Sequence, residues 1–167
     1  MSQVTQSPSE LINAESKQDI DQWLTKYPDD QKQSAVMAAL RIVQDQNGGW
    51  LTRELMDAVA DYLDMDNIHV YEVATFYSMY EHQPVGKHKI CVCTNISCMN
   101  CGSGKIVDHL EEKLDIKLGE TTEDNQFTLK EVECLGACSG APMIQIGEHY
   151  YENLSPEKID EILNSLK

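Results

Sequence analysis

The side chains of this sequence whose type and spacing could support chemistry are two pairs of cysteines. Cys93 and Cys98 are separated by four residues, and Cys134 and Cys138 by three. A [2Fe–2S] cluster is held by four cysteine thiolates, two on each iron. Two short pairs in separate segments therefore predict such a cluster, whose chemistry is the exchange of single electrons.

Two further cysteines, Cys91 and Cys101, leave the choice of ligands open on spacing alone. Cys93, Cys98 and Cys101 together form the C-x₄-C-x₂-C spacing of plant-type ferredoxins, for which Cys134 would be the distal ligand. Cys98 and Cys101 alone have the spacing of a zinc knuckle or of a thioredoxin-like thiol pair. Cys91 lies within an apolar segment and is expected to be a small buried residue of a strand.

The cysteine pairs need elements that bring them together, and residues 87–167 have a pattern of strands and helices that could do so. The expected order is strand, helix, strand, a hairpin of two strands, and helix, over Lys89–Thr94, Gly102–Asp115, Phe127–Cys134, Met143–Ile146, His149–Tyr151 and a last helix capped by Ser155 and Pro156. In a strand–helix–strand unit with parallel strands, the loops that follow both strands open at the same edge of the sheet. The two cysteine pairs are therefore expected to converge there. Neighbouring glycines could form turns or let backbone N–H groups approach the sulfurs: Gly102, Gly104, Gly136 and Gly140.

The N-terminal half has a different sequence pattern, in which helical periodicity replaces the alternation of strands and helices. Residues 1–15 are polar and aperiodic, so we expect them to be disordered. Residues 16–86 contain four helical patterns that could form a small bundle. The first pattern begins near Ser16 and ends near Pro28, and the second begins near Val36 and ends at Asn47-Gly48-Gly49. The third begins near Thr52 and ends after Leu63, and the fourth begins near Asn67 and ends before Pro84. The expected domains are thus 1–15, 16–86 and 87–167.

Composition and charge exclude several classes of function. The net charge is −15, from 28 acidic and 13 basic residues, so the chain repels phosphate backbones and anionic membrane surfaces. No apolar run approaches 18 residues, and the N-terminus lacks the features of a secretory signal. We therefore expect an intracellular protein without nucleic-acid binding or membrane insertion, whose clustered cysteines are metal ligands rather than disulfides.

A resemblance to a known family covers roughly residues 17–167. The run Cys134-Leu-Gly-Ala-Cys138-Ser-Gly-Ala-Pro-Met, with Cys93-x₄-Cys98 upstream, resembles the 24 kDa subunit family of respiratory complex I, which in bacteria is the E subunit of NADH-quinone oxidoreductase. Other similar stretches are Leu51–Met56, Val73–Tyr77, Pro84–Gly86 and Tyr150–Leu154. The resemblance implies an α/β fold in which an N-terminal helical bundle is followed by a thioredoxin-like [2Fe–2S] ferredoxin domain.

The resemblance also implies a ligand set, a role and partners. One [2Fe–2S] cluster would be held by Cys93, Cys98, Cys134 and Cys138, and no residue of the chain would be catalytic. The sequence has no G-x-G-x-x-G and no phosphate loop, so FMN and NADH are expected on a partner only. The implied partners are the flavin-bearing NADH-binding subunit of complex I and the adjacent large iron–sulfur subunit. The implied location is cytoplasmic, at the inner face of the bacterial plasma membrane through the complex.

Two alternatives to complex I stay open at this point. One is the equivalent diaphorase subunit of a soluble NAD-linked hydrogenase or formate dehydrogenase, which would differ in its partners. The other is a zinc-stabilised adaptor without redox function.

Overall fold

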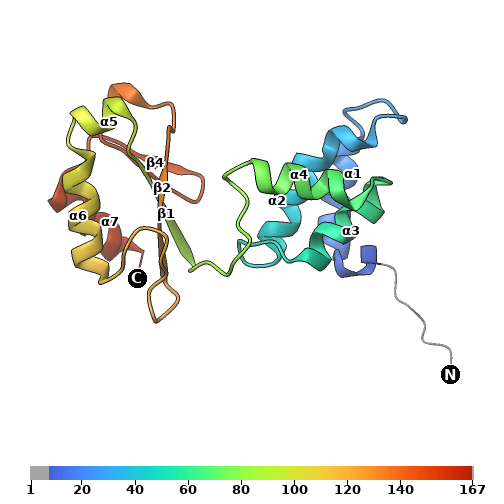
Figure 1. Cartoon of the computed structure of the whole chain (residues 1–167), viewed down its shortest axis with the longest axis horizontal. Coiled ribbons are helices and arrows are strands. Elements are labelled where there is room, and N and C mark those ends of the chain that lie inside the picture. Colours follow the sequence, from blue (N-terminus) through green and yellow to red (C-terminus); the bar gives the residue numbers. More distant parts are fainter. Residues whose placement is uncertain (1–7, 167) are drawn as a thin grey trace. The chain divides into compact units, whose positions relative to one another are not determined.

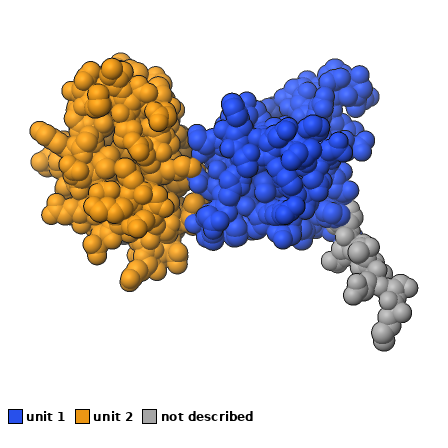
Figure 2. Space-filling view, viewed as in Figure 1, with its two compact units in different colours: residues 1–84 blue, residues 85–167 orange. Residues whose placement is uncertain are grey.

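The computed structural model describes residues 8–166, and the chain divides between Pro84 and Val85 into two compact units (Figures 1 and 2). The first unit consists of helices, and the second places helices against a four-stranded sheet. The expected fold class, α/β with N-terminal helices followed by a thioredoxin-like ferredoxin domain, is confirmed. None of the helices in the described part of the chain is long and apolar enough to cross a membrane.

The first unit is a bundle around one apolar core. Its elements are η1 (Pro8–Leu11), α1 (Ala14–Leu24), η2 (Lys32–Ala35), α2 (Val36–Gln46), α3 (Arg53–Leu63) and α4 (Asn67–Phe76). Leu40, Val59 and Val70 are fully buried at its centre, one from each of the last three helices. Thr52 caps α3 as predicted, because its side-chain oxygen accepts a hydrogen bond from the backbone N–H of Leu55 at 3.1 Å.

Residues 8–15 are ordered, which differs from the expectation of a disordered segment over residues 1–15. Ile12 is 1% exposed and belongs to the core of the first unit. Asn13 caps α1 by accepting from the backbone N–H of Ser16 at 2.8 Å. One apolar residue that reaches the core and one capping side chain therefore order a segment whose composition is mostly polar. Residues 1–7 lie outside the described part of the chain.

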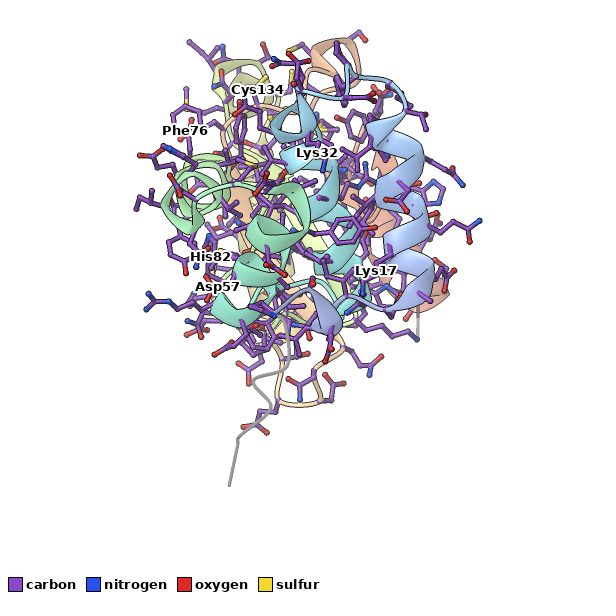
Figure 3. The ribbon with its side chains drawn as sticks, turned by 90° about the vertical axis from the view of Figure 1, so that its right-hand side faces the viewer. Lys17, Lys32, Asp57, Phe76, His82 and Cys134 are labelled. Atoms are coloured by element: carbon purple, nitrogen blue, oxygen red, sulfur yellow. The ribbon has the colours of Figure 1, made fainter. Side chains whose placement is uncertain are left out.

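Helix α4 ends at Phe76, earlier than the helix expected to run to Pro84. Gln44 holds the segment that follows: its side chain accepts from the backbone N–H of Glu81 at 2.8 Å and donates to the carbonyl oxygen of Met79 at 3.3 Å. These bonds satisfy backbone groups that a longer helix would have paired internally. Phe76 itself is 79% exposed (Figure 3).

The second unit is built on a sheet of strand order β2-β1-β3-β4. Its elements are β1 (His88–Cys93), α5 (Ile96–Asn100), α6 (Ser103–Leu114), β2 (Phe127–Val132), η3 (Cys138–Gly140), β3 (Ile144–Ile146), β4 (His149–Tyr151) and α7 (Pro156–Ser165). The helices α6 and α7 lie side by side, joined by a contact of 3.0 Å between His109 Nε2 and Asp160 Oδ1. Both contribute to the apolar core beneath the sheet, through Leu110 and Ile159.

The register of β1 and β2 determines where the cysteine loops emerge. The two strands pair in parallel, with Cys93 opposite Val132 at the last position of each strand. Both following loops therefore open at the same edge, as expected from the strand–helix–strand order. The predicted hairpin and final helix are also present, with Gly147 in the left-handed region at the turn and Ser155 as the cap of α7.

Candidate metal centre

The four predicted ligands lie at the end of β1 or in the segments that follow β1 and β2. Cys93 is the last residue of β1, and Cys98 is the third residue of the short helix α5. Cys134 follows β2 by two residues, because β2 ends at Val132 instead of extending to Cys134. Cys138 opens the single turn η3. Cys134 is among the side chains labelled in Figure 3.

Cys93 and Cys98 form a buried pair. Their exposed fractions are 4% and 2%, and they pack in a small cluster with the fully buried Met143. The Cys93 thiol approaches the carbonyl oxygen of Glu133 at 3.8 Å. Cys93 therefore sits against the backbone at the start of the segment that follows β2.

Burial raises the pKa of the Cys98 thiol to about 11, with smaller upward contributions from a hydrogen bond to Cys93 and from the nearby Cys138. A hydrogen bond with the backbone of Met143 acts in the opposite direction. The Cys98 thiol thus shares a hydrogen bond with one cysteine of its own pair, and its pKa is also raised electrostatically by one cysteine of the other pair. Cys101 is not among the main groups that shift this pKa.

The remaining cysteines are more open. Cys134, Cys138 and Cys101 are exposed, Cys91 is half-buried within β1, and none of the six cysteines forms a disulfide. Cys101 directly follows α5, where its backbone N–H donates to the carbonyl of Ser97 at 3.1 Å. All four predicted ligands are thus free thiols, two of them buried and two exposed.

The arrangement can be compared with the needs of two metal centres. Within residues 8–166, no three His, Cys, Asp or Glu side chains are grouped closely enough to hold one ion. A structural zinc needs four ligands around one point, whereas a [2Fe–2S] cluster takes two thiolates on each of two irons. The two buried and two exposed cysteines of the predicted set have the number and type of donors that such a cluster requires.

The glycines near the cysteines have different roles. Gly102 and Gly136 adopt φ values of +93° and +76°, which favour glycine over other residues at these turns. Gly104 lies in α6 with open space around its Cα, so nothing at that position requires glycine. The backbone group that hydrogen-bonds the Cys98 thiol belongs to Met143, which sequence reasoning did not select. Its only signal was its position in the run that ends in Ala-Pro-Met.

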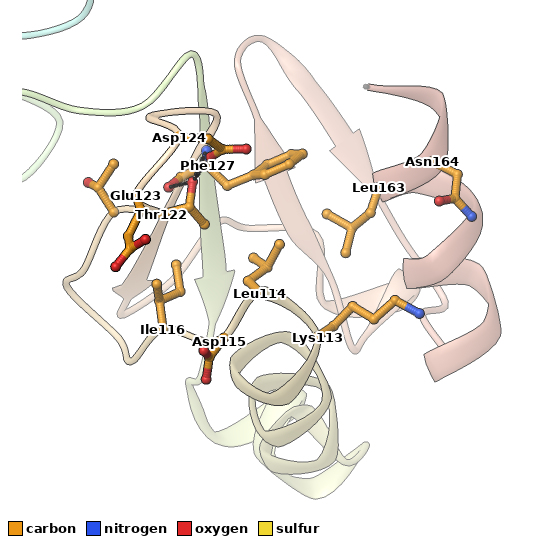
Figure 4. A pocket seen from close by; sticks show the side chains of 11 residues that line it. Lys113, Leu114, Asp115, Ile116, Thr122, Glu123, Asp124, Phe127, Leu163 and Asn164 are labelled. Carbon is orange, nitrogen blue, oxygen red and sulfur yellow. Dashed lines mark hydrogen bonds between the residues drawn. The ribbon is translucent and has the colours of Figure 1, made fainter.

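Figure 4 shows a pocket of about 420 Å³ in the second unit that no cysteine lines. It is lined from the C-terminal end of α6, which begins just after the cysteine loop. Since α6 has 12 residues, the pocket lies roughly 16 Å along the helix from that loop. The residues that line this pocket are Lys113, Leu114, Asp115, Ile116, Thr121, Thr122, Glu123, Asp124, Phe127, Leu163 and Asn164.

Several curated proteins are similar to this chain over most of its length. The E subunit of NADH-quinone oxidoreductase from Rickettsia felis is 49% identical over 84% of this chain and 84% of the relative. The protein of the same name from Rickettsia bellii is 47% identical over 86% of both chains. The second such protein of Rhizobium meliloti, named E subunit 2 of NADH-quinone oxidoreductase, is 42% identical over 90% of this chain and 88% of its own.

A solved structure shares the fold. The crystal structure of an NAD⁺-reducing [NiFe]-hydrogenase in the H₂-reduced state matches with a TM-score of 0.65 and 18% identity. The match covers 76% of this chain and 22% of the hydrogenase chain. The family model described as thioredoxin-like [2Fe–2S] ferredoxin matches residues 20–167. With that match, the cysteine pattern and the relatives in agreement, the chain belongs to the thioredoxin-like [2Fe–2S] ferredoxin family.

Proposed function

We propose that this chain is an electron-transfer subunit of an NADH:quinone oxidoreductase and holds one [2Fe–2S] cluster on Cys93, Cys98, Cys134 and Cys138. The observation that carries the proposal is the placement of the two cysteine pairs at one edge of the sheet. Cys93 ends β1, opposite Val132 at the end of β2, and packs with the buried Cys98. Leu135 and Ala137, which lie between the other two cysteines of the proposed set, pack against this buried pair. When bound, the cluster supplies one-electron chemistry.

The chain's own residues would hold and shield that group. Cys93 and Cys98 provide two thiols from a site closed to solvent, while Cys134 and Cys138 provide two from its open side. Leu135, Ala137 and Ala141 pack against the buried pair and keep water from it. The Met143 N–H stabilises the thiolate form of Cys98, which is the form that binds metal.

The similarity to the E subunits of NADH-quinone oxidoreductases favours the complex over a soluble enzyme. The relatives of that name are 42–49% identical, whereas the hydrogenase structure at 18% identity supports only the fold. On this proposal FMN and NADH bind to a separate flavin-bearing NADH-binding subunit. An adjacent large iron–sulfur subunit is the second proposed partner, and the complex places the chain at the inner face of the bacterial plasma membrane.

Metal and sulfide analysis of the chain tests the cofactor. The chain is isolated without oxygen and its iron, zinc and acid-labile sulfide are counted per polypeptide. We expect about two irons and about two sulfides, with visible absorbance that bleaches on addition of dithionite. About one zinc per chain with no sulfide would instead support the zinc-stabilised adaptor.

Affinity purification from native membranes tests the partner. The tagged chain is expected to recover a flavin-containing subunit that oxidises NADH. Recovery with hydrogenase subunits would instead favour a subunit of a soluble NAD-linked hydrogenase. Recovery as a free monomer would count against both the membrane complex and the soluble enzyme.

A further inference from the structure

The segment after β4 packs against the turn that carries Cys138. A Cβ atom added at Gly140 would lie 2.6 Å from Cβ of Glu152 and would also collide with the Glu152 carboxylate. Real Cβ atoms do not approach other atoms so closely, so only glycine allows the Glu152 side chain to lie flat on this turn.

Backbone hydrogen bonds fasten the same two segments together. The N–H of Asn153 donates to the carbonyl of Gly140 at 2.6 Å, and the N–H of Leu154 donates to the carbonyl of Pro142 at 3.1 Å. Within the turn, the N–H of Ala141 donates to the carbonyl of Cys138 at 3.3 Å. The Cys138 turn is therefore tied to residues 152–154 on one side and closed on itself on the other.

Residues 152–154 are a firm support for this turn. They directly follow β4, where Tyr151 pairs with Ile144 of β3. The Glu152 carbonyl also accepts a hydrogen bond from Lys158 Nζ at 2.5 Å, which ties the segment to α7. Leu154 is buried in the core of the second unit.

The Cys138 turn also covers the buried cysteine pair. Ala137 and Ala141 flank the turn, and both pack against the cluster that contains Cys93 and Cys98. Loss of the support would therefore expose these two thiols as well as displace Cys138.

We propose that Glu152 is a positioning residue: by lying on Gly140 it fixes Cys138 relative to Cys93 and Cys98, and its carboxylate, held on the turn that carries Cys138, would add negative charge near a bound cluster. The second part of this inference rests on the proposed function, while the first concerns the chain alone. The two parts can be tested separately. One substitution can disturb the packing while the carboxylate stays, and another can remove the charge while most of the packing stays.

Four variants and two controls make the test. E152A removes packing and charge, E152Q removes the charge and keeps the shape, and G140A introduces the colliding Cβ. The double variant E152A/G140A removes the side chain that the new Cβ would meet. E112Q controls for loss of one exposed charge in the same unit, and G104A controls for a glycine substitution where space is open.

The first readout uses the metal-free chain. The alkylation rate of Cys98 is measured by peptide mass spectrometry and divided by the rate of the exposed Cys101. We expect E152A and G140A to raise this ratio at least several-fold and the double variant to match E152A, because the added Cβ at position 140 no longer meets a Glu152 side chain. Rates for E152A and G140A that match those of both controls would overturn the positioning role.

The second readout uses the cluster-loaded chain. E152A and G140A are expected to change the electron paramagnetic resonance line shape, and E152Q to raise the midpoint potential with the line shape nearly kept. An E152Q potential equal to that of E112Q would overturn the charge part. If wild-type chain forms no cluster at all, the proposed function fails while the alkylation ratio still decides the positioning role.

Discussion

A thiol binds metal and reacts with electrophiles as its thiolate, so burial protects a cysteine until a metal displaces the proton. Cys98 combines the two conditions, since it is 2% exposed and burial raises its pKa to about 11. Cys101, only three residues away, is exposed. The two cysteines of the C-x₂-C segment thus differ in environment although they look equivalent in the sequence.

This difference predicts an order of alkylation in the metal-free wild-type chain. At pH 8, iodoacetamide should modify Cys101, Cys134 and Cys138 well before Cys93 and Cys98. The rate at Cys98 should still rise between pH 9 and pH 11, because its thiolate fraction grows until the pH passes its raised pKa. Peptide mass spectrometry at timed intervals checks this. Equal rates at Cys98 and Cys101 at pH 8 would contradict the described burial.

At the residue scale, the sequence predicted the residues that carry the chemistry but not those that support them. Cysteine spacing is visible in the chain, so the two pairs could be selected directly. The contact between Glu152 and Gly140 joins positions in different elements, and no local pattern shows it. The same holds for Met143, whose role depends on its backbone N–H and so is independent of its side-chain type.

At the scale of elements, the start of β1 is held by a close approach between two backbone segments. A Cβ at Gly86 would lie 2.8 Å from the backbone carbonyl carbon of Phe127, and the Gly86 N–H donates to Thr128 Oγ1 at 2.6 Å. This glycine lets the chain pass directly beside β2 as it enters the second unit.

The substitution G86A should therefore loosen the pairing of β1 with β2. We expect a cost of about 1–3 kcal/mol, because backbone has to shift to admit the methyl group. G104A, where space is open within α6, should be neutral or stabilising by about 0.5–1 kcal/mol. Hydrogen exchange of the backbone amides in β1 and β2 measures the effect of each substitution. Equal protection in the two variants would show that the close approach does not matter.

In the first unit, Tyr80 fastens the segment after α4 to α2. Its hydroxyl donates to the carbonyl of Met37 at 2.8 Å, and burial raises its pKa to about 12. Burial together with a hydrogen bond to Asp21 raises the pKa of Tyr62 to about 12 as well. Both phenols thus hold their protons more strongly in the folded chain than in the unfolded one, where the pKa is about 10.

These two pKa values predict the alkaline limit of stability. A raised pKa contributes stability that is complete below pH 10 and is lost as the pH rises through about 12. Urea unfolding followed by circular dichroism should show this loss in wild type, a smaller loss in Y80F, and the smallest in Y62F/Y80F. An unchanged pH dependence in the double variant would assign the loss to other groups.

Elements with capping residues and clear periodicity were predicted well, and elements that depend on distant contacts were not. Thr52 and Ser155 marked the starts of α3 and α7, because a cap is a local signal. The early end of α4 depends on Gln44, which lies in another helix. The helix α5 was missed because its five residues are too few to show a period.

At the scale of the whole molecule, the net charge of −15 bears on the reduction potential. Glu131 and Glu133 precede Cys134, and no arginine follows Arg53. The Glu131 carboxylate accepts a hydrogen bond from Thr94, the residue after Cys93, at 2.7 Å. Reduction adds negative charge to an already acidic surrounding, which is unfavourable and lowers the potential.

The potential of the cluster in the assembled complex should therefore be low. All-cysteine [2Fe–2S] centres lie near about −400 mV, and histidine ligation raises the range to roughly −150 to +300 mV. We expect a value in the all-cysteine range, so that NADH reduces the cluster only in part. A redox titration with a midpoint above about −150 mV would refute the charge argument.

The chain by itself should not oxidise NADH. Its sequence contains neither G-x-G-x-x-G nor a phosphate loop, and flavin is expected on the partner. Pure, flavin-free chain loaded with its cluster should therefore show no NADH:ferricyanide turnover above a blank without protein. Measurable turnover by this preparation would place nucleotide chemistry on the chain itself.

The choice of ligands is tested most directly by electron paramagnetic resonance of the dithionite-reduced chain in two serine variants. C138S and C101S remove exposed cysteines of the two competing ligand sets. Ligation by Cys93, Cys98, Cys134 and Cys138 predicts that C138S abolishes or strongly alters the cluster signal, while C101S leaves it nearly intact. The reverse result, an intact signal in C138S and a lost signal in C101S, would establish the plant-type set and contradict this account.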